Sequence, residues 1–238
     1  MELSVIVPTL NEAETLAATL EAAPRGAELI VSDGGSADET VAIAARHGAR
    51  VVTGERGRAL QLNRGAEAAA GDVLLFVHAD CVLGPDARDE IVLALEDRKN
   101  VGGAFSLRIR NASRGLKLIA AASNFRARHL GTPYGDQGLF VRKNAFDQVG
   151  GYPELPFMED VAIIRELGKM GKLVQLNAPI TTGRRHWQKL GPLATTLLNW
   201  SMVSLYKIGV PAETLAPYYR KLRNGSPRSR SESAWTAP

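Results

Sequence analysis

Residues 72–80 read Asp-Val-Leu-Leu-Phe-Val-His-Ala-Asp, and they decide how the rest of the chain is interpreted. The apolar run from Val73 to Val77 is too short for a globular helix and predicts a strand buried on both faces. Asp80 follows the carboxyl end of that strand. Ligands of open α/β sheets bind beyond the carboxyl ends of the strands, and a carboxylate there suits Mg²⁺ or Mn²⁺ held against a diphosphate. The stretch therefore predicts a buried sheet with a ligand site at one edge.

The segments before this strand alternate between strand and helix. Residues 28–32 repeat the pattern of an apolar run that ends in an acid, Asp33, before a glycine-rich turn. Periodicity predicts further strands at 3–7 and 50–52, and helices at 12–22, 38–47 and 59–70. Two capping arrangements are expected, at Asn11 with Glu14 and at Ser36 with Glu39. The βαβαβαβ order implies a parallel sheet with right-handed crossovers.

After Asp80 the alternation becomes irregular. Helices are predicted at 85–96, 114–128 and 160–170, strands at 102–108, 138–141 and 173–176, and mainly helix from there to residue 223. We expect one mixed α/β domain over residues 1–223 with helical additions at its C-terminal end. Residues 224–238 have the Gly, Ser, Pro and Arg content of a disordered tail.

Composition narrows the class of protein. The chain has 238 residues, 45% of them hydrophobic and 23% charged, with a formal net charge of +4, which is ordinary for a globular protein. No basic stripe with interleaved aromatic residues is present, so we expect no nucleic-acid partner. The single cysteine, Cys81, excludes an intrachain disulfide framework. The N-terminus lacks a basic leader, so we expect a cytoplasmic location.

One segment raises the question of membrane contact. Residues 190–206 contain no charged residue and are flanked by Lys189 and Lys207. The run is slightly short for a membrane span, and several Thr, Ser and Asn residues dilute it. We expect either a soluble helix or a helix that lies peripherally at a membrane surface.

The phosphate site has no glycine-rich fingerprint. Neither G-x-G-x-x-G nor G-x-x-x-x-G-K-[ST] occurs, so metal and side chains must hold the phosphates. The segment 54–65 contributes Arg58, whose guanidinium matches phosphate oxygens. Arg58 is therefore either a phosphate ligand or an ordinary surface residue.

Residues 4–12, Ser-Val-Ile-Val-Pro-Thr-Leu-Asn-Glu, resemble the opening of family 2 glycosyltransferases, which have the GT-A fold. Other segments are similar to that family's motifs in the same order: 33–40 to the nucleoside-binding turn, 78–80 to the metal motif, 159–160 to the acceptor-side acid pair, and 184–187 to the basic-aromatic element that follows. The resemblance covers roughly residues 1–220. Within the family it looks like the short soluble branch assigned to small glycoconjugates, including arsenosugar-like metabolites.

The resemblance implies roles for particular residues. The nucleoside pocket would be lined by Pro8, Thr9 and Glu12, and Asp33 would bind the base. Asp80 would hold Mn²⁺ or Mg²⁺, and Asp160, beside Glu159, would be the general base. Arg184 and Arg185 of the basic-aromatic element would clamp the diphosphate, together with Arg58 if the fold brings the three side chains to the same site.

Alternatives stay open for several of these residues and for two histidines. Asp33 also suits a turn residue before two glycines, and Glu159 with Asp160 also suits acids at a helix N-terminus. His78 replaces the first acid of the family motif, so it would donate a hydrogen bond, bind the metal or have a structural role. His186 would bind the metal or lie beside the phosphates.

Together these features predict a metal-dependent, inverting glycosyltransferase, with hexose transfer favoured. The donor would be a nucleoside-diphosphate sugar, with a UDP-sugar favoured, and the acceptor a small-molecule or lipid-linked hydroxyl. Two alternatives remain: a sugar-nucleotide-binding regulator without transfer activity, and a nucleotidyltransferase of the same fold.

Overall fold

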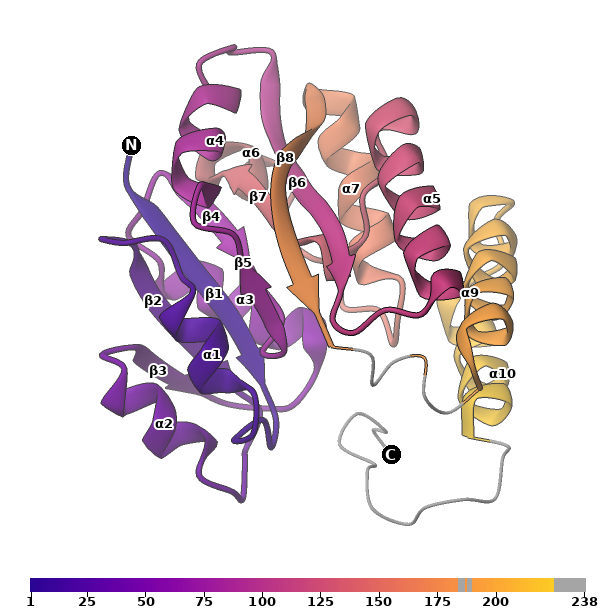
Figure 1. Cartoon of the computed structure of the whole chain (residues 1–238), viewed down its shortest axis with the longest axis horizontal. Coiled ribbons are helices and arrows are strands. Elements are labelled where there is room, and N and C mark those ends of the chain that lie inside the picture. Colours follow the sequence, from indigo (N-terminus) through magenta and orange to yellow (C-terminus); the bar gives the residue numbers. More distant parts are fainter. Residues whose placement is uncertain (184–186, 188–189, 225–238) are drawn as a thin grey trace.

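The computed structural model describes residues 1–183, 187 and 190–224, and their strands form one eight-stranded sheet in the order β3-β2-β1-β4-β7-β6-β8-β5 (Figure 1). The predicted disordered tail lies outside the described residues from residue 225 onward.

The amino-terminal half supplies four parallel strands and the helices between them. The strands are β1 (Leu3–Thr9), β2 (Glu28–Asp33), β3 (Arg50–Thr53) and β4 (Val73–Phe76). The helices are α1 (Leu16–Glu21), α2 (Thr40–Arg46) and α3 (Arg58–Ala68). β1 pairs in parallel with both β2 and β4, and β2 pairs in parallel with β3. The predicted βαβαβαβ order is confirmed.

The second half completes the sheet with mixed pairing. Its strands are β5 (Cys81–Leu83), β6 (Asn100–Ile109), β7 (Leu139–Arg142) and β8 (Lys172–Thr182). Its helices are α4 (Ala87–Ala94), α5 (Arg114–Leu130), the 3₁₀ turn η1 (Gly135–Gln137), α6 (Lys143–Gln148) and α7 (Glu159–Met170). β7 is antiparallel to β4 and β6, whereas β8 is parallel to β6 and antiparallel to β5. The sheet curls so that β5, at the far end of the strand order, contacts α1.

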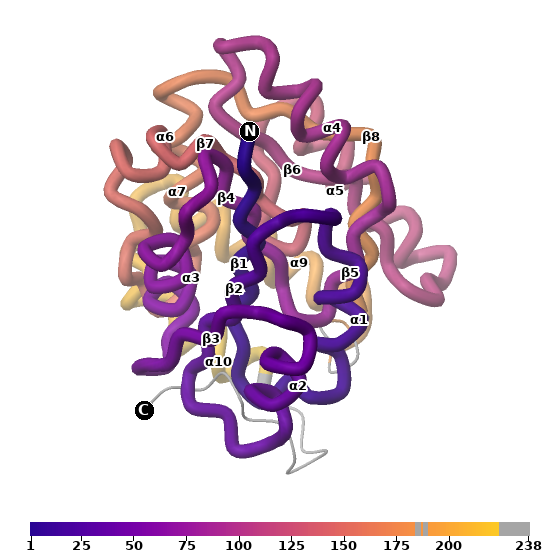
Figure 2. The backbone as a smooth tube through the Cα atoms, turned by 90° about the vertical axis from the view of Figure 1, so that its left-hand side faces the viewer, coloured from indigo at the N-terminus to yellow at the C-terminus, as the bar shows by residue number. Residues whose placement is uncertain are grey.

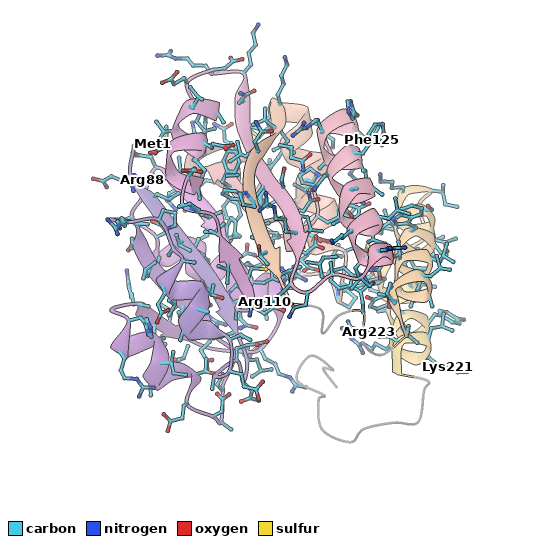
Figure 3. All side chains as sticks on the ribbon, viewed as in Figure 1. Met1, Arg88, Arg110, Phe125, Lys221 and Arg223 are labelled. Atoms are coloured by element: carbon cyan, nitrogen blue, oxygen red, sulfur yellow. The ribbon has the colours of Figure 1, made fainter. Side chains whose placement is uncertain are left out.

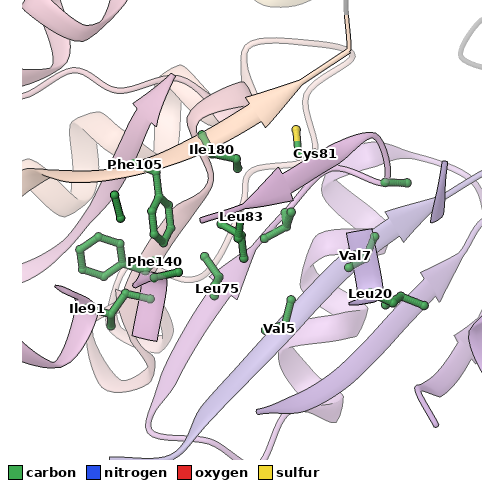
Figure 4. Packing of buried hydrophobic residues seen from close by; sticks show 14 of the residues in the cluster. Val5, Val7, Leu20, Leu75, Cys81, Leu83, Ile91, Phe105, Phe140 and Ile180 are labelled. Carbon is green, nitrogen blue, oxygen red and sulfur yellow. The ribbon is translucent and has the colours of Figure 1, made fainter. Parts of the chain in front are cut away.

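Side chains alternate between the two faces of the sheet, as expected for strands buried on both sides. Val5 and Val7 of β1 pack into one cluster with Leu16 of α1, part of which Figure 4 shows. Ile6, between them, packs on the other face with Leu62 of α3. Figure 2 shows α3 on one side of β1 and β4, and α1 with β5 on the other.

Two further helices, α9 (Pro192–Lys207) and α10 (Ala212–Asn224), lie beside α5 at one end of the molecule (Figure 1). A third cluster joins them to the beginning of α7 through Met158, Val161, Met202, Val203 and Leu215. In the described part of the chain, no helix is long and apolar enough to cross a membrane. The uncharged segment 190–206 lies largely within α9. Its contact with a membrane surface stays a prediction.

Both predicted capping arrangements are wrong. α1 begins at Leu16, after Thr15, and α2 begins at Thr40, and neither N-cap side chain accepts a capping hydrogen bond. Asn11 and Ser36 instead bond to each other's turns: the Asn11 amide donates to Ser36 Oγ, and the Ala37 amide donates to Asn11 Oδ1, both at 2.8 Å. The polar side chains that looked like local caps therefore join two turns.

Candidate functional site

The carboxyl ends of β1 and β2 meet at Asp33. Thr9 lies opposite Asp33 in the sheet register, and Asp33 is 1% exposed. Its carboxylate accepts hydrogen bonds from the Thr9 hydroxyl at 3.0 Å, from the Gly35 and Ser36 amides at 2.8 Å each, and from the Ser36 hydroxyl. Four donors fill the acceptor positions of a carboxylate. Asp33 therefore fixes the conformation of the glycine-rich turn.

The turn after β1 is bonded to the turn after β2. The Glu12 amide donates to Thr40 Oγ1 at 2.8 Å, and the Ala13 amide donates to Asp38 Oδ2 at 3.1 Å. Burial has an opposing effect, but hydrogen bonds from Thr40 and Ala13 lower the pKa of Asp38. The two turns thus form one hydrogen-bonded rim beside Thr9.

Gln61 of α3 hydrogen-bonds to the ends of both β1 and β2. This residue was not identified from the sequence. Its fully buried amide donates to the carbonyls of Thr9 at 2.7 Å and Ser32 at 2.9 Å. Its carbonyl oxygen accepts from the Gly57 amide at 3.3 Å. The available sequence signal was a polar residue on the apolar side of a predicted helix, next to Leu62.

Arg58, the first residue of α3, connects two predicted site segments. Its Nε lies 3.0 Å from Oε1 of Glu159, and a terminal nitrogen hydrogen-bonds Nε2 of His78. The Glu159 side chain is 5% exposed, whereas a third of the Arg58 side chain is exposed. Burial acts against the charge, but the carboxylates of Glu159 and Asp160 outweigh it and raise the pKa of Arg58. The guanidinium thus joins the end of β4 to the start of α7.

Asp160 is oriented by backbone amides. Gly135 donates to its Oδ2 at 2.9 Å, and Val161 donates to its Oδ1 at 2.8 Å. A Cβ on Gly135 would clash with the Arg58 guanidinium and would lie 3.2 Å from Asp160 Oδ2 and 3.4 Å from His78 Nε2. Gly135 is therefore the point where these three side chains converge.

The residue before the acid pair has a strained backbone. Met158 precedes α7 with φ 69°, in the left-handed region that residues with a Cβ rarely adopt. Its side chain is buried in the third cluster, against α9 and α10. Such strain persists where surrounding packing enforces it. Packing from the C-terminal helices therefore sets the conformation from which Glu159 and Asp160 begin α7.

Carboxyl groups outnumber guanidinium groups at this site. Burial raises the pKa of Asp136, against the lowering effect of Arg126. Burial likewise raises the pKa of Glu159, against the lowering effect of Arg58, and the charge of Asp160 adds to the increase. The site thus holds three acids with two cations.

Asp80 lies between β4 and β5 and is half-buried. A Cβ on Gly183, just after β8, would lie 3.1 Å from Asp80 Oδ2. The next residues in sequence are the predicted Arg184, Arg185 and His186, which lie outside the described residues. Within the described residues, no three His, Cys, Asp or Glu side chains converge as a metal cluster. One carboxylate nevertheless fits Mg²⁺, which proteins bind through one or two carboxylates plus water and substrate phosphates.

Asp80 aside, the predicted residues that the structure describes fall into two groups. Thr9 and Asp33 meet at the rim, where Pro8 is buried in β1 and Glu12 accepts the Thr15 hydroxyl at 3.1 Å. The other group comprises Arg58, His78, Glu159 and Asp160, which are joined by contacts through Arg58 and Gly135.

The sequence is similar to sequences of known glycosyltransferases. A family model described as Glycosyl transferase family 2 matches residues 4–149. An uncharacterized glycosyltransferase of Mycobacterium tuberculosis is 41% identical over 78 residues, which cover 32% of this chain and 36% of that protein. A PGL/p-HBAD biosynthesis glycosyltransferase of the same species is 40% identical over 88 residues and is covered over 34% of its length. The match thus spans about a third of these curated relatives.

Solved structures share the fold at low sequence identity. Glucosyl-3-phosphoglycerate synthase from M. tuberculosis, in complex with Mn²⁺, UDP and glucosyl-3-phosphoglycerate, has a TM-score of 0.62 and 23% identity. That match covers 88% of this chain and 81% of the synthase. A mannosyltransferase from Pyrobaculum calidifontis, in complex with GDP-Man and Mn²⁺, has a TM-score of 0.64 and 18% identity, covering 93% of this chain and 69% of its own. These likenesses confirm the predicted GT-A fold.

Proposed function

This chain belongs to glycosyl transferase family 2, and on that premise we propose that it transfers a hexose from a nucleoside-diphosphate sugar, with UDP as the favoured nucleotide, to a hydroxyl acceptor with inversion. The observation that carries this proposal is the convergence of Arg58, His78 and Asp160 on Gly135. It joins the end of β4, on the predicted donor side, to the acid pair of α7.

The rim formed by the turns after β1 and β2 is proposed to bind the nucleoside, with Pro8, Thr9 and Glu12 beside it. Asp33 already accepts four hydrogen bonds. A contact with the base would therefore have to replace one of these donors. We propose that Asp33 acts mainly by holding the turn that the nucleoside contacts.

Asp80 is proposed to hold Mn²⁺ or Mg²⁺ together with the donor diphosphate, with His186 as a further candidate ligand. Support comes from the half-buried carboxylate at the strand end and from the Mn²⁺ named with the similar synthase and mannosyltransferase. When bound, such a cation neutralises charge on a departing diphosphate. Arg184 and Arg185 follow Gly183, which lies against Asp80, and are proposed to contact the same phosphates.

Asp160 is proposed to be the general base. The acceptor oxygen forms a bond to the anomeric carbon while the bond from that carbon to the diphosphate oxygen breaks, and the electron pair leaves with the diphosphate. The hydroxyl proton passes to Asp160, whose two oxygens are already oriented by the amides of Gly135 and Val161. Positioned proton transfer of this kind contributes about 10²- to 10⁴-fold to the rate.

His78 is proposed to act as a hydrogen-bond donor on the donor side. A guanidinium can only donate, so the contact between Arg58 and Nε2 of His78 requires that nitrogen to accept. In that arrangement the imidazole would carry its proton on Nδ1. This tautomer agrees with the alternative in which His78 donates a hydrogen bond. Asp80 then binds the metal in place of His78.

The test is a thermal-shift panel of UDP, GDP, ADP, CDP and dTDP, each with and without Mn²⁺. Saturating ligand at about 100 times its dissociation constant adds about 2.7 kcal/mol of stability. We expect one nucleotide, with UDP favoured, to stabilise the protein in a metal-dependent manner and to lose this effect in Asp80→Asn.

Asp160→Asn is the matched variant for the chemistry. It should keep the nucleotide-induced shift while sugar transfer falls by about 10²-fold or more. A normal transfer rate in Asp160→Asn would refute the assignment of the base. Nucleotide binding without any transfer by the wild type would favour a sugar-nucleotide-binding regulator.

A further inference from the structure

The surface formed by α5, α9 and α10 exposes several large apolar side chains to solvent. On α9, Leu193, Leu197 and Trp200 follow the i, i+4, i+7 spacing of one helix face. They are 72%, 53% and 49% exposed, and this face is opposite to the buried Met202. α9 is therefore apolar on its solvent side as well as on the side packed in the third cluster.

The neighbouring helices α5 and α10 also expose large apolar side chains. Leu118 and Phe125 of α5 are 72% and 65% exposed, and Tyr218 of α10 is 62% exposed. Figure 1 shows the three helices together at one end of the molecule, and Figure 3 shows Phe125 and Lys221 on that end. We call the exposed side chains of α5, α9 and α10 the outer helical face.

These three helices carry many more basic than acidic residues. Together they carry eight Lys and Arg residues against one acid: Arg114, Lys117, Arg126, Arg128, Lys207, Arg220, Lys221 and Arg223 against Glu213. Arg126 lies over the Tyr134 ring beside the candidate site, so seven of the eight remain for the outer helical face. The remaining chain carries 21 basic and 24 acidic residues, from totals of 29 and 25. The basic excess of the protein is therefore concentrated on the three helices that also carry Leu118, Phe125 and Trp200 as exposed apolar side chains.

We infer that the outer helical face binds the surface of an anionic lipid bilayer. Exposed Leu, Phe and Trp side chains insert at the boundary between headgroups and acyl chains, and surrounding Lys and Arg attract anionic headgroups. A second copy of this chain fits less well, because two strongly basic faces would repel each other. The inference concerns binding only and does not depend on the transfer reaction.

The test is sedimentation of the full chain with vesicles. We expect binding to phosphatidylcholine vesicles that contain about a third phosphatidylserine, weak binding to pure phosphatidylcholine, and release as salt is raised. Equal binding to both vesicle types, or no binding to either, would overturn the inference.

Variants locate the contact. Leu197→Ser with Trp200→Ser, and separately Lys117→Glu with Lys221→Glu, should each weaken binding about tenfold or more. Leu93→Ser on α4, where Leu93 is 67% exposed, and Lys99→Glu before β6 are the matched controls and should bind normally. Self-association without vesicles that Leu197→Ser abolishes would instead assign this face to a second copy. Melting curves verify that every variant is folded.

Discussion

At the scale of single residues, Gly135 matters because of what a side chain there would displace. Its amide orients Asp160, and a Cβ would clash with the terminal nitrogen of Arg58. That nitrogen ends a flexible side chain, so it can move with little loss of stability. Gly135→Ala should therefore change the free energy of unfolding by less than about 1 kcal/mol but slow transfer about 10- to 100-fold, because small displacements of reacting groups are costly.

Steady-state kinetics and urea unfolding on the same preparation check this prediction. Gly115→Ala is the control, since a Cβ there lies 4.0 Å from Ser113 Oγ and touches no site residue. Unchanged transfer in Gly135→Ala would show that the convergence of Arg58, His78 and Asp160 is not functional.

Asp136 and Asp38 should make the stability of the protein depend on pH in opposite directions. Burial raises the pKa of Asp136 above its ordinary value of 3.8, so the stability that it contributes is fully present below pH 3.8 and is lost as pH rises through the folded pKa. Hydrogen bonds lower the pKa of Asp38, so its contribution is present above pH 3.8 and is lost as pH falls through the folded pKa.

Urea unfolding at a series of pH values measures both effects. Relative to wild type, Asp136→Asn should become progressively more stable as pH rises above 3.8, whereas Asp38→Asn should be less stable near neutrality and converge with wild type in acid. The same sign of pH dependence for both variants would contradict the assigned causes.

At the scale of elements, the sequence predicted the strands and helices that a local residue pattern defines. The four parallel strands appear as short apolar runs, and their helices as periodic segments, because each buries a face of its own. β5 was missed because it has three residues and depends on pairing with residues 180–182. The caps failed because Asn11 and Ser36 bond across 25 positions of sequence. Gln61 acts through two strands whose proximity only the fold establishes.

The candidate site divides in the same way. Arg58, His78 and the acid pair were predicted as separate segments with roles carried by family resemblance. Their connection through Arg58 and Gly135 could not be predicted, because it joins positions far apart in the chain. Arg184, Arg185 and His186 stay predictions.

Two helical glycines should respond in opposite directions to the same substitution. Gly168 of α7 is exposed, with no atom within 4 Å of an added Cβ, whereas a Cβ on Gly65 of α3 would clash with Ile6 of β1. Gly168→Ala should raise the free energy of unfolding by about 0.5–1 kcal/mol through helix propensity. Gly65→Ala should lower it by about 1–3 kcal/mol through overpacking.

Thermal and urea unfolding distinguish the two glycine variants, and Gly168→Ala should leave transfer unchanged. Stabilisation by both substitutions would show that α3 can move away from β1 without cost, contrary to the close packing in the structure.

At the scale of the whole molecule, the predicted donor and acceptor sides depend on different cores. The rim beside Thr9 and Asp33 stands on the two sheet clusters, whereas the start of α7 is held by the third cluster through Met158. Leu215 of α10 belongs to that third cluster and is 4% exposed. Leu215→Ala should cost about 2–4 kcal/mol, as buried Leu-to-Ala changes do, and should loosen the strained Met158 ahead of Asp160.

The expected result is slower transfer with an unchanged nucleotide-induced thermal shift, together with faster hydrogen exchange in the first turn of α7. Leu222→Ala on the same helix is the control, because Leu222 is 53% exposed, and it should affect none of the three measurements. Should Leu215→Ala weaken nucleotide binding as much as transfer, the two sides would have to be one cooperative unit. In that case the C-terminal helices would support the donor rim as well as the acid pair.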